Sequence, residues 1–188
     1  MITGFFAWWF KLSGWKIKGE VPSDLKKAVV IAAPHTSNWD FLYALAVFNI
    51  LKLKVNYLAK KELFAFPLSI ILKATGGIPV ERSKKQNLTD ALISKFNNNK
   101  ELLIMIPAEG TRKLVPKWKS GFYFTALGAN VPVLPGYLDY AKKEAGFGEP
   151  IYLTGNQEID MARFKEFYKD KTGKNPDQFS VDSIKIES

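Results

Sequence analysis

The sequence contains a single histidine, and its neighbours are those expected of a catalytic base. His35 directly follows an apolar run, residues 27–33, and Asp40 lies five residues further on. A carboxylate that accepts a hydrogen bond from Nδ1 of a histidine fixes the tautomer of the ring and leaves Nε2 able to take a proton. His35 and Asp40 are therefore candidates for the general base and its orienting carboxylate, the pair found in a catalytic triad but without the serine.

The spacing between His35 and Asp40 sets a condition on the local structure. On one continuous helix, five residues correspond to a rotation of about 140°, so the two side chains would not share a face. The pairing requires His35 at a strand end, a turn over residues 36–38 with Ser37 or Asn38 as helix cap, and Asp40 in the first turn of the helix. The alternative is an aspartate that caps the helix beside an incidental histidine.

A second polar cluster, residues 107–112, also follows an apolar run. A Glu, Gly, Thr and Arg at a strand end are suited to binding an anion, with Glu109 orienting Arg112 and with the backbone amides of Gly110 and Thr111 available. The alternative is a surface turn with its own ion pair.

Arg82 ends a third short stretch, residues 76–82, and is a further candidate for anion binding. The alternative is a solvated charge beside Lys84 and Lys85.

These clusters need strands and helices to position them, and the hydrophobic pattern predicts an α/β fold. Short apolar runs rich in β-branched residues alternate with helical segments, which is typical of a mostly parallel central sheet flanked by helices. Sites in such sheets form where strands end and helices begin. We expect strands at 27–33, 55–59, 78–81, 102–106, 131–138 and 147–153, and helices at 39–51, 62–75, 88–96, 122–127 and 160–169.

The length of 188 residues predicts one domain, and the absence of cysteine excludes a disulfide scaffold, a zinc–thiolate site and a thiol nucleophile. The net charge of +9 is uneven: residues 1–100 hold 15 basic and 6 acidic residues, whereas residues 101–188 hold 12 of each. An anionic partner should therefore meet the N-terminal half.

The first 18 residues indicate which anionic partner this is. They contain a dense aromatic cluster followed by lysines but are too short to span a bilayer, which is typical of a segment that lies at a membrane interface. The alternative is a first helix packed on the core of the domain. No nucleic-acid-binding signature is present. The cluster and its lysines are Ile2, Phe5, Phe6, Trp8, Trp9, Phe10, Leu12, Trp15, Lys11, Lys16 and Lys18. We expect an interfacial segment at 1–20, a domain at 21–172 and a polar, loosely ordered tail at 173–188.

Taken together and in this order, the motifs resemble the PlsC-like glycerolipid acyltransferases, a resemblance that covers roughly residues 29–152. The family's motifs match this sequence in the His35–Asp40 block, in a Gly-x-Ile-Pro-Val-x-Arg stretch ending at Arg82, in Glu109–Arg112, in Val131–Pro135 and in the Lys-Glu-Leu stretch that begins at Lys61. One departure is Ala108, where the family has proline before the glutamate.

The resemblance implies transfer of a fatty acyl group from acyl-CoA or an acyl carrier protein to the free hydroxyl of a lysophospholipid, with 1-acylglycerol-3-phosphate as the expected acceptor. His35 and Asp40 would be catalytic. Substrate-binding residues would be Lys61, Arg82, Glu109, Gly110, Thr111 and Arg112. We expect no metal, no cofactor beyond the acyl donor, and a place on the cytoplasmic face of the cell membrane. The alternatives are an acyl-thioester hydrolase with the same His–Asp pair and a non-catalytic module that binds anionic lipid.

Overall fold

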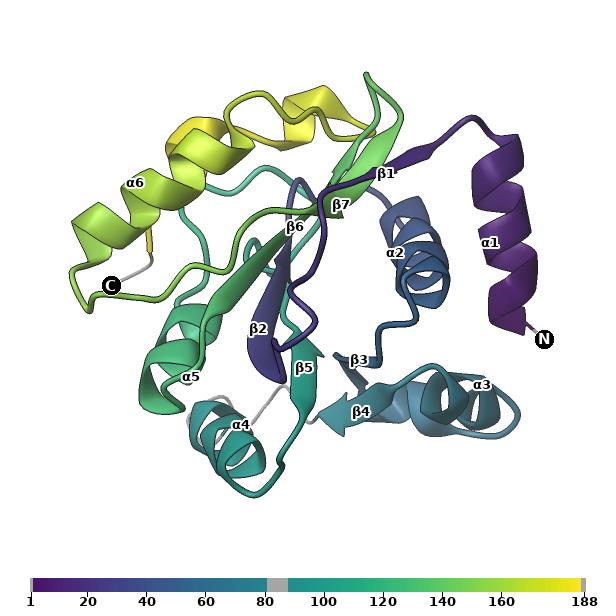
Figure 1. Cartoon of the computed structure of the whole chain (residues 1–188), viewed down its shortest axis with the longest axis horizontal. Helices are drawn as coiled ribbons and strands as arrows, with labels where there is room; N and C mark the ends of the chain where they lie inside the picture. Colours follow the sequence, from purple (N-terminus) through teal and green to yellow (C-terminus); the bar gives the residue numbers. More distant parts are fainter. Residues whose placement is uncertain (1, 81–87, 187–188) are drawn as a thin grey trace.

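The computed structural model describes residues 2–80 and 88–186, with side chains from residue 7, and it shows one seven-stranded sheet with helices on both faces (Figure 1). The strand order is β1-β7-β6-β2-β5-β3-β4, and every described pair of neighbouring strands is parallel except β6 and β7. The expected α/β fold is confirmed. The strands are β1 (Lys16–Lys18), β2 (Lys27–Ala32), β3 (Val55–Lys60), β4 (Gly77–Val80), β5 (Leu102–Met105), β6 (Val133–Asp139) and β7 (Glu144–Phe147). The helices are α1 (Ile2–Leu12), α2 (Trp39–Ile50), α3 (Leu68–Ala74), α4 (Leu88–Asn97), α5 (Gly121–Gly128) and α6 (Gln157–Tyr168).

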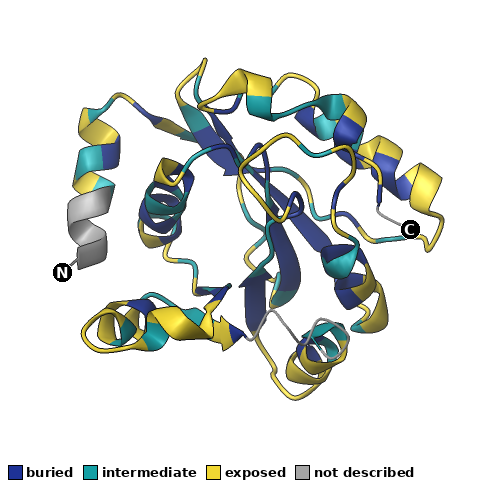
Figure 2. Ribbon diagram, turned by 180° about the vertical axis from the view of Figure 1, so that it is seen from behind, coloured by how far each residue is buried: buried dark blue, intermediate teal, exposed yellow. Residues whose placement is uncertain are grey.

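Each face of the sheet carries its own hydrophobic core, because alternate residues of a strand point to opposite faces. In β2, Val29 and Ile31 pack against the side covered by α4, α5 and α6, whereas Ala28 and Val30 pack against the side covered by α2. Helix α1 lies outside α2 (Figures 1 and 2). The strands are therefore apolar on both faces, as the sequence pattern predicted.

Three predicted segments differ from the structure, and proline accounts for the first two differences. The helix expected at 62–75 is split into a 3₁₀ turn, Lys61–Phe64, and α3, because Pro67 lacks a backbone N–H and disfavours a helical residue before it. Strand β6 begins after Pro132 rather than at residue 131. The edge strand expected at 147–153 lies earlier in the chain: β7 ends at Phe147 and pairs with both β6 and β1, and beyond it Ile151 bridges back to Val133.

The N-terminal segment is partly built into the domain. The side chains of Phe10 and Trp15 are buried, and β1 forms an edge of the sheet, whereas Trp8 and Leu12 point to solvent. None of the helices within 2–80 and 88–186 has the length and apolar character needed to cross a bilayer.

The C-terminal segment is also packed, in contrast to the loosely ordered tail expected at 173–188. It forms two 3₁₀ turns, at Pro176–Gln178 and Val181–Ser183, and Ile184 is completely buried in the core on the α6 side. A few apolar residues in a polar stretch are enough to dock it when the domain offers a complementary surface.

Candidate active site

His35 and Asp40 form the pair that the sequence predicted. His35 lies just beyond the carboxyl end of β2, and Asp40 lies in the first turn of α2, with His35 Nδ1 and Asp40 Oδ2 separated by 3.1 Å. His35 lines an open cavity, whereas Asp40 is buried. The arrangement leaves Nε2 of the ring as the nitrogen that can accept a proton from a bound molecule.

Asp40 also determines the shape of the loop that follows His35. Its Oδ2 accepts hydrogen bonds of 2.9 Å from the backbone amides of Thr36 and Ser37, and its Oδ1 accepts one of 2.7 Å from the hydroxyl of Tyr140. Asn38 occupies the cap position of α2 but makes no capping bond with its side chain. Tyr140 was not identified in the sequence, because it lies 100 residues from Asp40 and in no recognisable motif.

Glu109 lies behind His35 rather than beside Arg112. The Glu109 side chain is 3% exposed, and its Oε2 accepts a hydrogen bond of 2.9 Å from the backbone N–H of His35. Its Oε1 is buried and has no hydrogen-bond partner among the residues that the structure describes. Burial raises the pKa of Glu109 to about 8, with a smaller contribution from the negative charge of Asp40, while the His35 N–H opposes the shift. The expected pairing of Glu109 with Arg112 is replaced by this contact with the histidine backbone.

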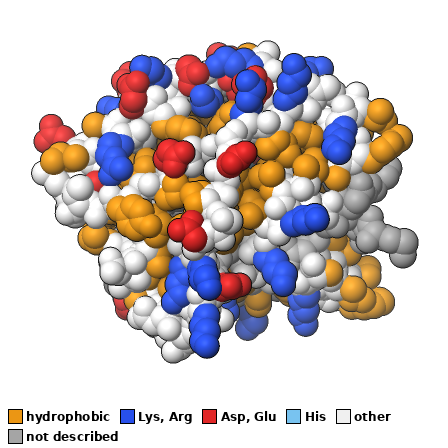
Figure 3. Space-filling view, in the orientation of Figure 1, with side chains coloured by type: hydrophobic (Ala, Val, Ile, Leu, Met, Phe, Trp, Pro, Cys, Tyr) orange, Lys and Arg blue, Asp and Glu red, His pale blue; other side chains and the backbone are white. Residues whose placement is uncertain are grey.

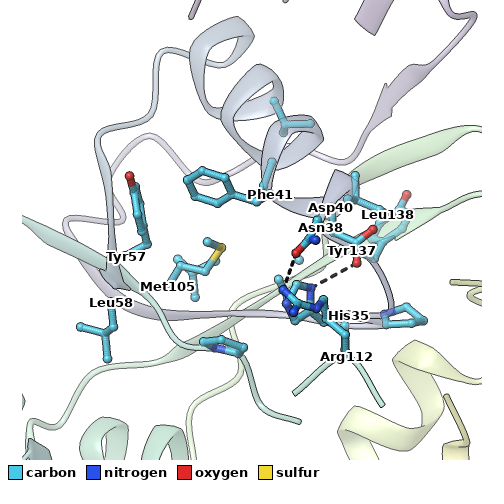
Figure 4. A pocket seen from close by; sticks show the side chains of 18 of the residues that line it. His35, Asn38, Asp40, Phe41, Tyr57, Leu58, Met105, Arg112, Tyr137 and Leu138 are labelled. Atoms are coloured by element: carbon cyan, nitrogen blue, oxygen red, sulfur yellow. Dashed lines mark hydrogen bonds and ion pairs between the residues drawn. The ribbon is translucent and has the colours of Figure 1, made fainter. Parts of the chain in front are cut away.

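Arg112 reaches the mouth of the same cavity as His35, where its guanidinium donates a hydrogen bond to Asn38 Oδ1 (Figure 4). Gly110 and Thr111 also line the cavity. Gly110 has a φ of +69°, a left-handed conformation that glycine adopts without strain, and this turn carries Arg112 from β5 toward His35.

One predicted binding residue, Lys61, lies outside this cavity. Lys61 opens the 3₁₀ turn after β3 and lies outside the cavity lining, while its neighbour Lys60 is part of the lining. Arg82 lies outside the described residues.

The backbone amides nearest to His35 already have protein acceptors. The amides of Thr36 and Ser37 donate to Asp40, that of His35 donates to Glu109, and the Gly110 amide donates to Pro107 O at 3.2 Å. A group that stabilises a developing oxyanion must offer it a hydrogen-bond donor that is not already bound to another acceptor. These four amides are therefore occupied by the architecture of the site.

The cavity beside His35 has a volume of about 590 Å³ and lies between α2 and the sheet. Its polar end holds His35, Asn38 and Arg112, and its far end is apolar, with Tyr57, Leu58 and Met105 (Figure 4). The rest of the apolar lining comes mainly from α2 and from strands β2, β6 and β7: Val30, Ala32, Phe41, Ala44, Val47, Phe48, Leu138, Gly146 and Phe147. The volume and the separation of polar and apolar ends suit a molecule with a reactive polar head and a hydrocarbon chain.

The segment at 63–72 contributes to this cavity only at its ends. Leu63 and Leu72 line it, whereas Phe66, Leu68, Ile70 and Ile71 are exposed. Most of this stretch therefore faces solvent.

The C-terminal segment binds the loop that follows His35, through hydrogen bonds to Thr36. Asn175 donates its backbone N–H to Thr36 Oγ1 at 3.1 Å and its side-chain amide to Thr36 O at 2.7 Å. No sequence signal could have identified Asn175, because its partner is 139 residues away. Within the described part of the chain, no three acidic or histidine side chains gather closely enough to hold a metal ion.

Comparisons with known proteins show the family of the chain and a similar fold. Residues 15–139 match the sequence model of the family described as Acyltransferase. The structure is similar to the crystal structure of the 1-acyl-sn-glycerophosphate (LPA) acyltransferase PlsC from Thermotoga maritima, with a TM-score of 0.57 and 20% sequence identity over 92% of this chain and 80% of that one. At this identity the likeness shows a common fold. No curated protein matches the sequence significantly.

Proposed function

The chain belongs to the Acyltransferase family, and on that premise we propose that it moves a fatty acyl group from a thioester donor to the free hydroxyl of a lysophospholipid, with 1-acylglycerol-3-phosphate as the preferred acceptor. The observation that carries the proposal is the position of the His35–Asp40 pair. It lies at the polar mouth of a cavity of about 590 Å³ whose inner wall is apolar. A base for the hydroxyl and a hydrophobic pocket for an acyl chain are thus adjacent.

The catalytic step uses His35 as general base. Nε2 takes the proton of the acceptor hydroxyl as its oxygen attacks the thioester carbonyl carbon and forms the new C–O bond. When the C–S bond breaks, the leaving thiolate takes this proton from the imidazolium and departs as a thiol, which returns His35 to its neutral form. Asp40 keeps the ring oriented and stabilises its positive charge while the proton is held. The chain has no cysteine, which favours direct attack in a complex of both substrates over an acyl-enzyme.

In this proposal Arg112 binds the phosphate of the acceptor. Its planar guanidinium can make two hydrogen bonds to one phosphate, and it lines the cavity mouth beside His35. Lys60, which also lines the cavity, supplies a second positive charge. The proposed acyl-CoA or acyl carrier protein would deliver its chain into the apolar end of the cavity.

The test of the reaction is acyl transfer by purified protein, with products identified by mass spectrometry over a panel of lysolipids and acyl donors. Replacing His35 by Ala should abolish transfer to lysophosphatidic acid while binding to anionic vesicles persists. Retained turnover in this variant would show that His35 is not the base. Rapid loss of acyl-CoA that does not depend on lysolipid would instead show a hydrolase.

We also propose that the protein binds peripherally to an anionic membrane, at the cytoplasmic face of the cell membrane. Exposed apolar side chains on or beside α1 and α3 support this, and these two helices lie on the same side of the molecule (Figures 1 and 2). On the face drawn in Figure 3, hydrophobic side chains are exposed among lysines and arginines. Phe66 is 84% exposed and Ile70 is 62% exposed, next to the exposed Lys60, Lys61 and Lys73. Trp8 and Leu12 add an apolar surface on α1. Apolar side chains edged by lysine are typical of surfaces that enter the headgroup region of a bilayer.

Vesicle flotation tests the membrane surface separately from catalysis. Replacing Phe66 and Ile70 together by Ser should weaken binding to anionic vesicles at least tenfold, because burial of each side chain contributes about 1.5–3 kcal/mol. The matched control is Ile159→Ser, which removes an exposed isoleucine from α6 on the other side of the sheet. Equal vesicle binding by the double variant and the wild type would show that this surface does not meet the membrane.

A further inference from the structure

The carboxylate of Asp40 is held at both oxygens, and one of the holding groups belongs to no motif of the chain. Oδ2 accepts hydrogen bonds from His35 Nδ1 and from two backbone amides of the loop, and all three donors lie within five residues of Asp40. Oδ1 accepts a hydrogen bond of 2.7 Å from the hydroxyl of Tyr140. Tyr140 follows β6 and is one residue beyond the range that matches the family, residues 15–139.

Burial, and next the hydrogen bond to Asp40, raise the pKa of Tyr140 well above its ordinary value. The hydroxyl therefore keeps its proton throughout the pH range of an enzyme assay and remains a donor to Asp40. Asp40 is only 5% exposed, so water cannot easily replace a lost donor at Oδ1.

The ring of Tyr140 is itself fixed by segments from both ends of the chain. Trp15 meets it edge-on with ring centroids 4.9 Å apart, and Tyr43 of α2 meets it at 5.8 Å. The backbone N–H of Tyr140 donates to Thr172 O at 2.9 Å. Trp15 is buried between α1 and β1, where it also packs against Phe10. The aromatic N-terminal segment thus supports the residue that holds the catalytic carboxylate.

We propose that Tyr140 is a positioning residue for the proposed acyl transfer, and that Trp15 braces it. Tyr140 anchors Oδ1 of Asp40, which keeps Oδ2 facing His35 Nδ1 and holds the imidazole in the tautomer with a free Nε2. The N-terminal segment is in this way part of the structure that orients the base, in addition to its proposed contact with the membrane. The inference rests on the role of His35 as base in the proposed function.

The first experiment is Tyr140→Phe, which removes the hydroxyl and keeps the ring in place against Trp15. The expected result is a kcat lower by about 10- to 100-fold, the range for one hydrogen bond to a charged group. KM should stay unchanged for both substrates, since Tyr140 is outside the cavity lining. The matched control is Tyr43→Phe, which removes a hydroxyl from the same aromatic cluster that is not among the donors to Asp40, and its kcat should stay within twofold of the wild type.

The second readout does not depend on activity. His35 is the only histidine in the chain, so NMR of protein labelled with nitrogen-15 histidine reports on this ring alone. The wild type should show Nδ1 bearing the proton in the neutral ring. Tyr140→Phe should lower the population of that tautomer, and Trp15→Phe should change the spectrum and kcat in the same direction by a smaller amount.

The two readouts separate this inference from the proposed function. Absence of acyl transfer by the wild type contradicts the function, and the imidazole spectra still test the positioning role. Unchanged kcat and unchanged spectra in Tyr140→Phe overturn the inference. A raised KM with an unchanged spectrum also overturns it, because Tyr140 would then act on the substrate. Wild-type behaviour of Trp15→Phe in both measurements removes the bracing role.

Discussion

Replacing Glu109 with Gln removes a buried ionisable group while retaining an oxygen that can accept the N–H of His35. In the wild type, burial raises the pKa of Glu109 to about 8 from an ordinary value of 4.5. The folded protein therefore binds this proton more tightly than the unfolded chain does. The resulting stability is complete at low pH and is lost as pH rises from about 4.5 through about 8.

The size of the effect follows from the two pKa values. A shift of one pKa unit corresponds to about 1.4 kcal/mol, so a shift from 4.5 to about 8 has a ceiling of about 5 kcal/mol. Between pH 5 and pH 8 the loss from this single group is about 3.5 kcal/mol. Gln at this position does not titrate. The free energy of unfolding of Glu109→Gln, relative to the wild type, should therefore rise by about 3.5 kcal/mol over this interval.

Urea denaturation followed by tryptophan fluorescence at several pH values measures this difference directly. The control is Glu149→Gln, because Glu149 is exposed and its replacement should leave the pH dependence of stability as in the wild type. Comparing variant with wild type at each pH cancels the contributions of the groups that they share. A difference that is the same at pH 5 and pH 8 would refute the assignment of a raised pKa to Glu109.

Four further predictions concern the site and its support. Asp40→Asn should lower kcat about 100-fold or more in the acyl-transfer assay, since Asn does not stabilise the protonated ring, and a loss below fivefold would contradict the pairing. Arg112→Gln should raise KM for the phosphate-bearing acceptor about tenfold with little change in kcat, and equal KM values would show that the phosphate binds elsewhere. Ala44→Phe narrows the apolar part of the cavity and should shift preference to shorter acyl donors in competition assays; an unchanged profile would place the chain elsewhere. Ile184→Ala should lower the free energy of unfolding by about 2–5 kcal/mol in urea denaturation, and a near-zero change would contradict packing of the C-terminal segment.

The sequence predicted the sheet well because its strands are buried on both faces. The apolar run at 27–33 predicts a buried strand regardless of which helices cover it, and it forms β2 at the centre of the sheet. β1 was missed because it has only three residues, and β7 was placed three residues too late. These strands at one edge are held by pairing with β6 and each other rather than by a strong hydrophobic pattern of their own.

The division of the N-terminal segment between core and surface required the tertiary structure. Composition alone left an interfacial segment and a core helix as alternatives for residues 1–18. Phe10 and Trp15 are buried, whereas Trp8 and Leu12 are exposed, so one short segment has both characters. Which face of α1 is covered depends on its packing against α2. The sequence displays no simple pattern that predicts this packing.

The sequence by itself predicted the contact between His35 and Asp40, because His35 is the only histidine of the chain and Asp40 is close enough along the chain to reach it through a single turn. Local spacing and chain geometry are enough for such a contact. Only the tertiary structure decided that Glu109 supports His35 from behind, that Tyr140 holds the second oxygen of Asp40, and that α2 encloses an apolar cavity against the sheet. Those contacts join residues 74 and 100 positions apart, and they arise because parallel strands bring their carboxyl ends to one edge of the sheet.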